Sequence, residues 1–334
     1  MNVAAFALLA TAIAIYAVLD GYDLGVAAVA PFVARGSAQR AAAMESIGPF
    51  WNGNEVWLIV AGGLLFALFP RAYASAFSGF YLPFTTVLWL LMFRGISLEL
   101  RNHFASDLWR GFWDTAFTGA SALLAVLFGV TLGNLVRGLP LDANGYFLGR
   151  FAFLLNPYAL AVGIFALLAL AQHGLAFLTL RTDGELAERS RRLLSRLWWG
   201  VLLLYCATTL ASLALRSGVA VGAPMRSAPL VVLSLLALGG VHWFSRVGKP
   251  GLAFAASSLF LVSLVLAAAS TMYPYLLPAF PAGSGGIDIT NAGSGPVGLA
   301  RTLALTLPGL LAVVLYSIFV IRRMRGCPRS TSEL

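Results

Sequence analysis

Long apolar runs alternate with short charged or Gly/Pro-rich breaks along the whole chain. A helix of about 20 apolar residues crosses the ~30 Å hydrocarbon core of a bilayer. The pattern therefore predicts an all-α integral membrane protein with nine membrane-spanning helices. We expect these spans at about 3–19, 55–70, 76–93, 115–136, 154–178, 198–215, 229–245, 251–272 and 300–321.

The end of the first run has two interpretations. Apolar residues continue past Asp20 and Asp23 to about Ala34, and a helix of that length exceeds the membrane thickness unless it kinks near Gly21 or Gly25. Alternatively, the two aspartates end the first span at the membrane boundary and the glycines break the helix.

The composition excludes a large domain outside the membrane. Apolar residues make up 60% of the chain and charged residues 10%. No polar stretch approaches the ~100 residues of a usual globular domain, so residues 1–334 form one polytopic domain. The longest irregular segment, residues 273–299, is rich in Gly, Pro and Ser and is expected to be a loop lying on the outer surface.

The Arg and Lys residues predict the orientation. Most of them follow the first, third, fifth, seventh and ninth spans, and cationic loops resist translocation. The N-terminus is therefore expected outside, and the tail of residues 322–334 in the cytoplasm. The net charge of +9 is then an orientation signal, because the arginines are spread over short loops and form no nucleic-acid footprint.

Metal and cofactor ligands are scarce. The three histidines are His103 in a cytoplasmic loop, His173 late in the fifth span and His242 late in the seventh. The last two fall at similar depth, so they are either a pair or two separate interfacial histidines. We expect no metal site in this chain.

Acidic residues near the membrane carry the functional hypothesis, because ionisable groups at membrane depth are costly and mark proton or ion paths. Asp20 and Asp23 are three residues apart, which places them on one helical face. Asn52 and Glu55 repeat this spacing at the start of the second span. All four are expected near the cytoplasmic boundary.

Further acidic residues follow the third predicted span. Glu99 follows the third span, where Arg94 and Arg101 are close enough in sequence to pair with it, so an ordinary salt bridge is the alternative to a proton path. Asp107 and Asp114, in the same predicted loop, are expected to be solvated charges.

The stretch WNGNEVW also has a purely structural interpretation. Asn52 is a good N-cap and Glu55 falls at the third helical position, so the pair resembles a capping box. Trp51 and Trp57 flank it and are expected to support it or to lie at an interface.

Eight collinear motifs together resemble subunit II of the cytochrome bd quinol oxidases. They are DGYDLG, SIGPFWNGNEVWL, AFSGFY, FRGISLELR, GNLVRGLPLD, LNPYALAVG, LRTDGELAERSRR and MYPYLLP. The resemblance implies two four-helix bundles, residues 1–136 and 154–272, followed by the external loop 273–299 and a peripheral ninth helix at 300–321.

The resemblance also implies partners and cofactors. A similarly folded subunit I in the bacterial cytoplasmic membrane would carry haems b and d, and the complex would oxidise quinol and reduce dioxygen to water with protons from the cytoplasm. Some family members hold a structural quinone in subunit II. The complex has either two subunits or a further small accessory subunit. Membrane lipid surrounds the complex, and no nucleic acid is expected.

Family proton-route positions carry over only where the motifs match. Asp23 is retained as the second acid of D-G-[YF]-D-x-G, whereas Asn52 stands where the family commonly has an acid, and an amide cannot exchange a proton at physiological pH. Glu55 or Glu99 would then take over the relay. Two rival functions are a proton-coupled secondary transporter, which usually places carboxylates near the midplane, and a purely structural scaffold.

Overall fold

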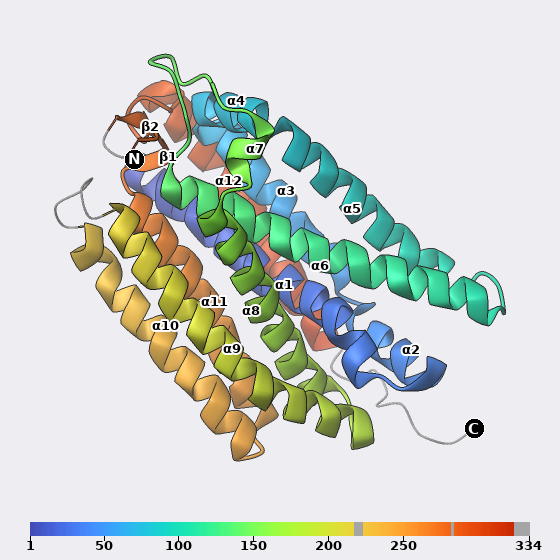
Figure 1. Ribbon diagram of the computed structural model, residues 1–334. Helices are drawn as coiled ribbons and strands as arrows, with labels where there is room; N and C mark the ends of the chain where they lie inside the picture. Colours follow the sequence, from blue (N-terminus) through green and yellow to red (C-terminus); the bar gives the residue numbers. More distant parts are fainter. Residues whose placement is uncertain (217–222, 282–283, 324–334) are drawn as a thin grey trace.

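The fold was taken from a computed structural model, in which residues 1–216, 223–281 and 284–323 are described. This part of the chain forms twelve helices and one two-stranded hairpin (Figure 1). Eight of these helices are long and apolar enough to cross a membrane. The chain is therefore an all-α, multi-pass membrane protein, as the hydropathy pattern predicts.

The first half of the chain holds six helices. They are α1 (Asn2–Val33), α2 (Gly36–Ile47), α3 (Trp51–Leu68), α4 (Pro70–Gly79), α5 (Tyr81–Leu100) and α6 (Asp107–Arg137). Helix α1 is continuous over 32 residues, or about 48 Å. The interpretation in which the helix breaks at Gly21 and Gly25 after Asp20 and Asp23 is therefore wrong, since both carboxylates lie in the interior of a longer helix.

Gly21 and Gly25 do not break α1, and Gly25 serves helix packing. A Cβ atom on Gly25 would lie 1.9 Å from the carbonyl oxygen of Leu170 in α8 (Pro157–Arg181). A Cβ atom on Gly174 would lie 2.3 Å from the carbonyl carbon of Gly25. Glycine at both positions therefore lets the backbones of α1 and α8 touch, as small residues do between membrane helices.

The boundaries predicted for the second and third spans differ from the structure. The second span is α3, whose 18 residues include a polar first turn, so it is not among the eight long apolar helices. A separate short helix, α4, follows it because the backbone of Phe69 leaves the helical region and Pro70 starts a new helix. The third span is α5 and begins only at Tyr81.

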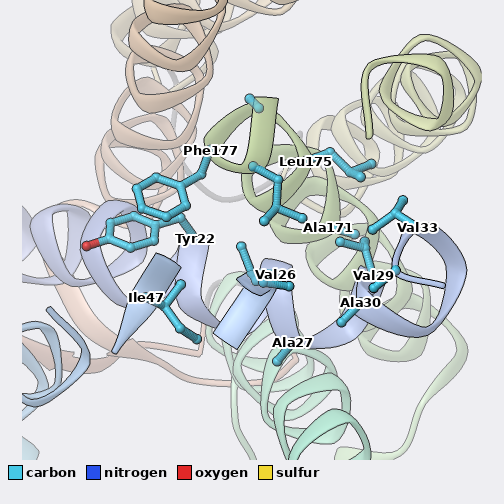
Figure 2. Close-up of a cluster of buried hydrophobic side chains, with 14 of the residues drawn as sticks. Tyr22, Val26, Ala27, Val29, Ala30, Val33, Ile47, Ala171, Leu175 and Phe177 are labelled. Atoms are coloured by element: carbon cyan, nitrogen blue, oxygen red, sulfur yellow. The ribbon is translucent and has the colours of Figure 1, made fainter. Parts of the chain in front are cut away.

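The second half of the chain packs against α1 and α6. It contains α7 (Phe151–Leu154), α8, α9 (Gly184–Arg216), α10 (Ala223–Arg246), α11 (Pro250–Met272) and α12 (Gly295–Arg323). Helices α8 to α11 lie side by side (Figure 1). Tyr22 of α1 stacks on Phe177 of α8, with ring centroids 4.2 Å apart (Figure 2).

The predicted loop 273–299 contains a small hairpin. Strands β1 (Tyr275–Pro278) and β2 (Gly286–Asp288) pair antiparallel, and the backbone of Leu139 bonds to this segment. Asn2 donates to the carbonyl of Ile289 at 2.7 Å, so the N-terminus lies at the same end of the molecule. Helix α12 begins at Gly295, earlier than predicted, and the tail beyond residue 323, with Arg325 and Arg329, lies outside the described residues.

Candidate functional site: a buried arginine among three carboxylates

The guanidinium of Arg94 is buried among the helices of the first half of the chain and faces three carboxylates. It donates to Asp20 at 2.5 Å and to Glu55 at 3.0 Å, and it lies 3.6 Å from Asp23. The side chains of Arg94, Asp20 and Asp23 are fully buried, whereas the Glu55 side chain is 26% exposed. Glu55 is therefore the one of these four residues that is accessible from the surface of the chain. We call these four residues the Arg94 cluster.

Three helices contribute to the Arg94 cluster. Asp20 and Asp23 project from one face of α1, since residues three apart are neighbours on a helix. Glu55 lies in the first turns of α3, and Arg94 lies near the end of α5. The cluster therefore exists only once α1, α3 and α5 have packed together.

Two neutral side chains, Tyr16 and Asn54, bond directly to the carboxylates, and a third, Tyr22, bonds to Asn54. Tyr16 donates its hydroxyl to Asp20 at 2.8 Å. The side-chain amide of Asn54 donates to Asp23 at 2.8 Å and to the hydroxyl of Tyr22 at 2.7 Å. Within the described residues, the second carboxylate oxygen of Asp23 is buried and has no hydrogen-bond partner.

The two aspartates therefore differ in their surroundings. Asp20 is bound through both oxygens, one to Arg94 and one to Tyr16. One oxygen of Asp23 has no hydrogen-bond partner in the part of the chain that the structure describes. Asp20 is placed as the fixed counter-ion of Arg94, and Asp23 as the carboxylate with a free site for a proton.

The charges of the Arg94 cluster do not balance when every member is ionised. One guanidinium faces three carboxylates. Uncompensated charge is expensive in a low-dielectric interior, and binding a proton relieves it. The chemistry that this arrangement supports is the reversible binding of protons.

A second ion pair lies two turns further along α5. Arg101 donates to Asp114 of α6 at 2.6 Å, and Arg40 of α2 approaches the same carboxylate at 3.8 Å. Arg94 and Ser97 of α5 share one helical face with Arg101, the C-cap residue of α5, and all three are buried. Seven residues of helix separate the two arginines by about 10 Å, with the hydroxyl of Ser97 between them.

Several sequence-based expectations about this site are wrong. Helix α3 starts at Trp51 with Phe50 as its N-cap, and no side chain caps it, so Asn52 and Glu55 do not form a capping box. Asn52 is exposed and outside the Arg94 cluster. The helical hydrogen-bond pattern begins in the turn that follows α2, because the backbone N–H of Asn54 donates to the carbonyl of Phe50.

The expected pairing of Glu99 is also not found. Its side chain is exposed, and it forms no ion pair with any residue that the structure describes. Arg94 and Arg101 instead pair with acids on other helices. Asp114, expected to be solvated, is buried because α6 extends seven residues before it and packs against α5.

The two tryptophans lie beside this site. The ring of Trp51 lies against Gly95, where a Cβ atom would be 3.4 Å away, and Trp57 is buried. Three contributors were not assigned from the sequence: Tyr16, Asn54 and Asp114. Tyr16 could have been found, since it lies four residues before Asp20 on the same face; Asn54 and Asp114 carried no comparable signal.

The histidines do not form a pair. His173 uses both ring nitrogens, with Ser257 at 2.9 Å and the carbonyl of Val18 at 3.1 Å, whereas His242 packs on the rings of Trp198 and Trp199. No cluster of three or more His, Cys, Asp or Glu residues in the described chain could hold a metal ion. His173 thus has no ring nitrogen left to act as an axial haem ligand.

The fold and the Arg94 cluster together define the class: a multi-pass helical membrane subunit with an ionisable site buried between its spans. Residues 1–324 match the family model described as cytochrome bd terminal oxidase subunit II. The chain therefore belongs to this family, and it is a subunit of a quinol oxidase complex, an oxidoreductase.

Individual relatives agree with this assignment. The chain is 31% identical over 342 residues to cytochrome bd-I ubiquinol oxidase subunit 2 of Escherichia coli, with 92% of this chain and 88% of the relative covered. It is 31% identical over 308 residues to cytochrome bd ubiquinol oxidase subunit 2 of Bacillus subtilis, with 91% of each covered.

A solved structure has the same fold. The chain matches the bd oxidase from Geobacillus thermodenitrificans with a TM-score of 0.78, over 98% of this chain and 99% of that one. The sequence identity is 19%, so this similarity concerns the fold alone.

Proposed function

We propose that this chain supplies the proton-uptake route of its oxidase. The observation that carries the proposal is the Arg94 cluster, in which three carboxylates share one buried guanidinium. Protons would enter at the level of Arg101 and Asp114, pass the hydroxyl of Ser97 and reach the cluster. Buried groups along one face of α5 support this direction.

The orientation belongs to the same proposal. The N-terminus and the hairpin lie at one end of the molecule, and the arginine-rich ends of α1, α5 and α8 lie at the other (Figure 1). We infer that this arginine-rich end faces the cytoplasm of a bacterium and that the N-terminus is outside. Asp114 then lies nearest the proton source.

Within the Arg94 cluster, Asp23 would be the relay and Asp20 the fixed counter-ion, because among the described residues Asp20 is bonded through both oxygens and Asp23 through one. Glu55 would connect the cluster to the partner subunit, since it is the one partly exposed member. Asn52 and Glu99 are not part of the route in this proposal. The free energy required to hold three carboxylates beside one arginine argues against a scaffold role alone.

Replacing Glu55 with Gln tests this route without removing the hydrogen bond to Arg94, because the amide oxygen can still accept it. We expect assembly and haem content like the parent, and oxygen uptake per haem slowed about threefold. Asn52→Asp is the matched control: its exposed side chain adds a carboxylate to the same turn, and it should leave uptake unchanged. Parental turnover of Glu55→Gln at every pH would exclude Glu55 from the relay.

We further propose that haems b and d are bound by the partner subunit I, where quinol and dioxygen react. The engagement of both nitrogens of His173 supports this division of labour. The proposal also includes a structural quinone bound by this chain and a small accessory subunit. It does not include transport of a solute by this chain alone.

Expression of this chain with and without subunit I tests the haem assignment. Redox-difference spectra of the purified chain alone should show no haem. The chain should also be unstable, since small residues such as Gly62 and Gly119, where an added Cβ atom would meet no other helix among the described residues, would pack closely only against partner helices. Co-expression should restore both haem absorption and stable protein. A stable, haem-containing preparation of the single chain would contradict the assignment.

A further inference from the structure

A cavity of about 260 Å³ lies between α1, α2 and α6, at the arginine-rich end of the molecule. Its apolar wall is formed by Ala30, Pro31 and Met44, and its polar wall by Arg40 and Asp114 together with two threonines of α6. The cavity therefore presents an apolar side and a charged side to the same ligand. The Arg94 cluster contributes no residue to it.

The charged wall has an excess of positive charge. Asp114 already binds Arg101 at 2.6 Å and 3.5 Å through both carboxylate oxygens. Arg40 reaches the same carboxylate only at 3.8 Å, which is too long for a hydrogen bond, and its Nε atom is buried without a partner among the described residues. Arg40 is thus a cavity-lining cation that forms no close hydrogen bond with the acid beside it.

The depth of the cavity matches the headgroup region. Asp114 lies seven residues, or about 10 Å, inside the start of α6, and Pro31 lies two residues before the end of α1. Pro31 and Thr115 are exposed at its rim. Phe32 of α1 and Phe112 of α6, 77% and 59% exposed, add apolar surface to the same two helices.

We propose that this cavity binds the phosphate group of an anionic phospholipid, with Arg40 as its ligand. The guanidinium offers charge-assisted hydrogen bonds to phosphate oxygens, and the wall of Ala30, Pro31 and Met44 receives the first part of an acyl chain. The net positive charge favours a phosphate that is not paired with a cationic headgroup. This site adjoins the entry of the proposed proton route, because Asp114 lines the cavity and also binds Arg101.

The test uses the whole oxidase complex and measures lipid, not turnover. Complexes with the parent chain, Arg40→Gln and Arg35→Gln would be purified, and retained phosphatidylglycerol would be counted by native mass spectrometry. Arg35 is exposed in the same connection and serves as the charge-matched control. We expect Arg40→Gln to weaken binding of one phosphatidylglycerol about tenfold, the loss of one charge-assisted hydrogen bond, and Arg35→Gln to leave it unchanged.

A second variant keeps every charge. Thr115→Trp, at an exposed position that lines the cavity, should block the site from the lipid side and lower retention as Arg40→Gln does. Melting temperatures in nanodiscs of phosphatidylglycerol or phosphatidylcholine, and in detergent with inorganic phosphate, separate the possible sources. Stabilisation of the parent by phosphatidylglycerol alone supports the lipid; equal stabilisation by inorganic phosphate would overturn it.

Two other results would overturn the proposal. Equal retention of phosphatidylglycerol by the parent and Arg40→Gln would show that Arg40 binds no lipid. Loss of subunit I from the Arg40→Gln complex with lipid retention unchanged would show that a carboxylate of the partner occupies the cavity.

Discussion

Replacing Arg94 with Gln is expected to reduce the assembled oxidase in membranes sharply. The substitution leaves Asp20, Asp23 and Glu55 without the guanidinium that all three share. Removing one partner of a buried ion pair costs about 3–5 kcal/mol, because the remaining charge is buried without compensation. That loss is a large part of the ~5–15 kcal/mol by which proteins are usually stable. The measurement is the amount of this chain and of haem per membrane protein.

A double variant separates charge from packing. Arg94→Gln combined with Asp20→Asn removes the cation and its closest anion together, so assembly should recover in part relative to the single variant. Arg94→Lys keeps the charge but not the fork that reaches Asp20 and Glu55 at once, and it should give an intermediate amount. A single variant that assembles like the parent would show that Arg94 does not stabilise the three carboxylates.

Replacing Asp23 with Asn should give the opposite pattern, with assembly intact and catalysis impaired. The amide is nearly isosteric and can still accept the hydrogen bond from Asn54, but it cannot carry a proton. We expect haem content like the parent and oxygen uptake per haem about tenfold lower, equivalent to ~1.4 kcal/mol on the limiting barrier. The deficit should grow as the pH rises, since fewer protons are then available for uptake.

Two comparisons make this result specific. Asp107→Asn makes the same chemical change at an exposed position and should not alter uptake. Asp20→Asn removes the carboxylate that binds Arg94 most closely, so it should lower assembly more than Asp23→Asn does. If Asp23→Asn consumes oxygen like the parent across the pH series, the proton route does not pass through Asp23 and the scaffold role gains support.

Part of the candidate site was readable from the sequence. Asp20, Asp23, Glu55 and Arg94 stood out because charged groups in apolar runs are rare, and the structure brings all four together. Which of these acids pairs with Arg94 could not be predicted from the sequence. Glu99 was the expected partner of Arg94 because it is close in sequence, but five residues of helix point the two side chains to different faces.

The same limit explains Asn52 and Asp114. Local rules favoured Asn52 as an N-cap, but the preceding turn starts α3 two residues earlier, with Phe50 as the N-cap, and leaves the Asn52 side chain exposed. Asp114 sits in a charged stretch that local rules read as a loop, whereas α6 extends through it and packs on α5. In both cases a neighbouring element decided the outcome.

By itself, the sequence determined that this chain is helical and crosses a membrane many times, because the free energy of transfer into lipid adds up residue by residue along each run. The sequence also determined the family to which the chain belongs, through motifs in a fixed order. The tertiary structure alone decided which acids share Arg94 and that Asp23 keeps a free oxygen. The reason is physical: those contacts depend on how α1, α3 and α5 are set against one another. Contacts between these helices, such as that of Trp51 in α3 with Gly95 in α5, form only after the helices have packed.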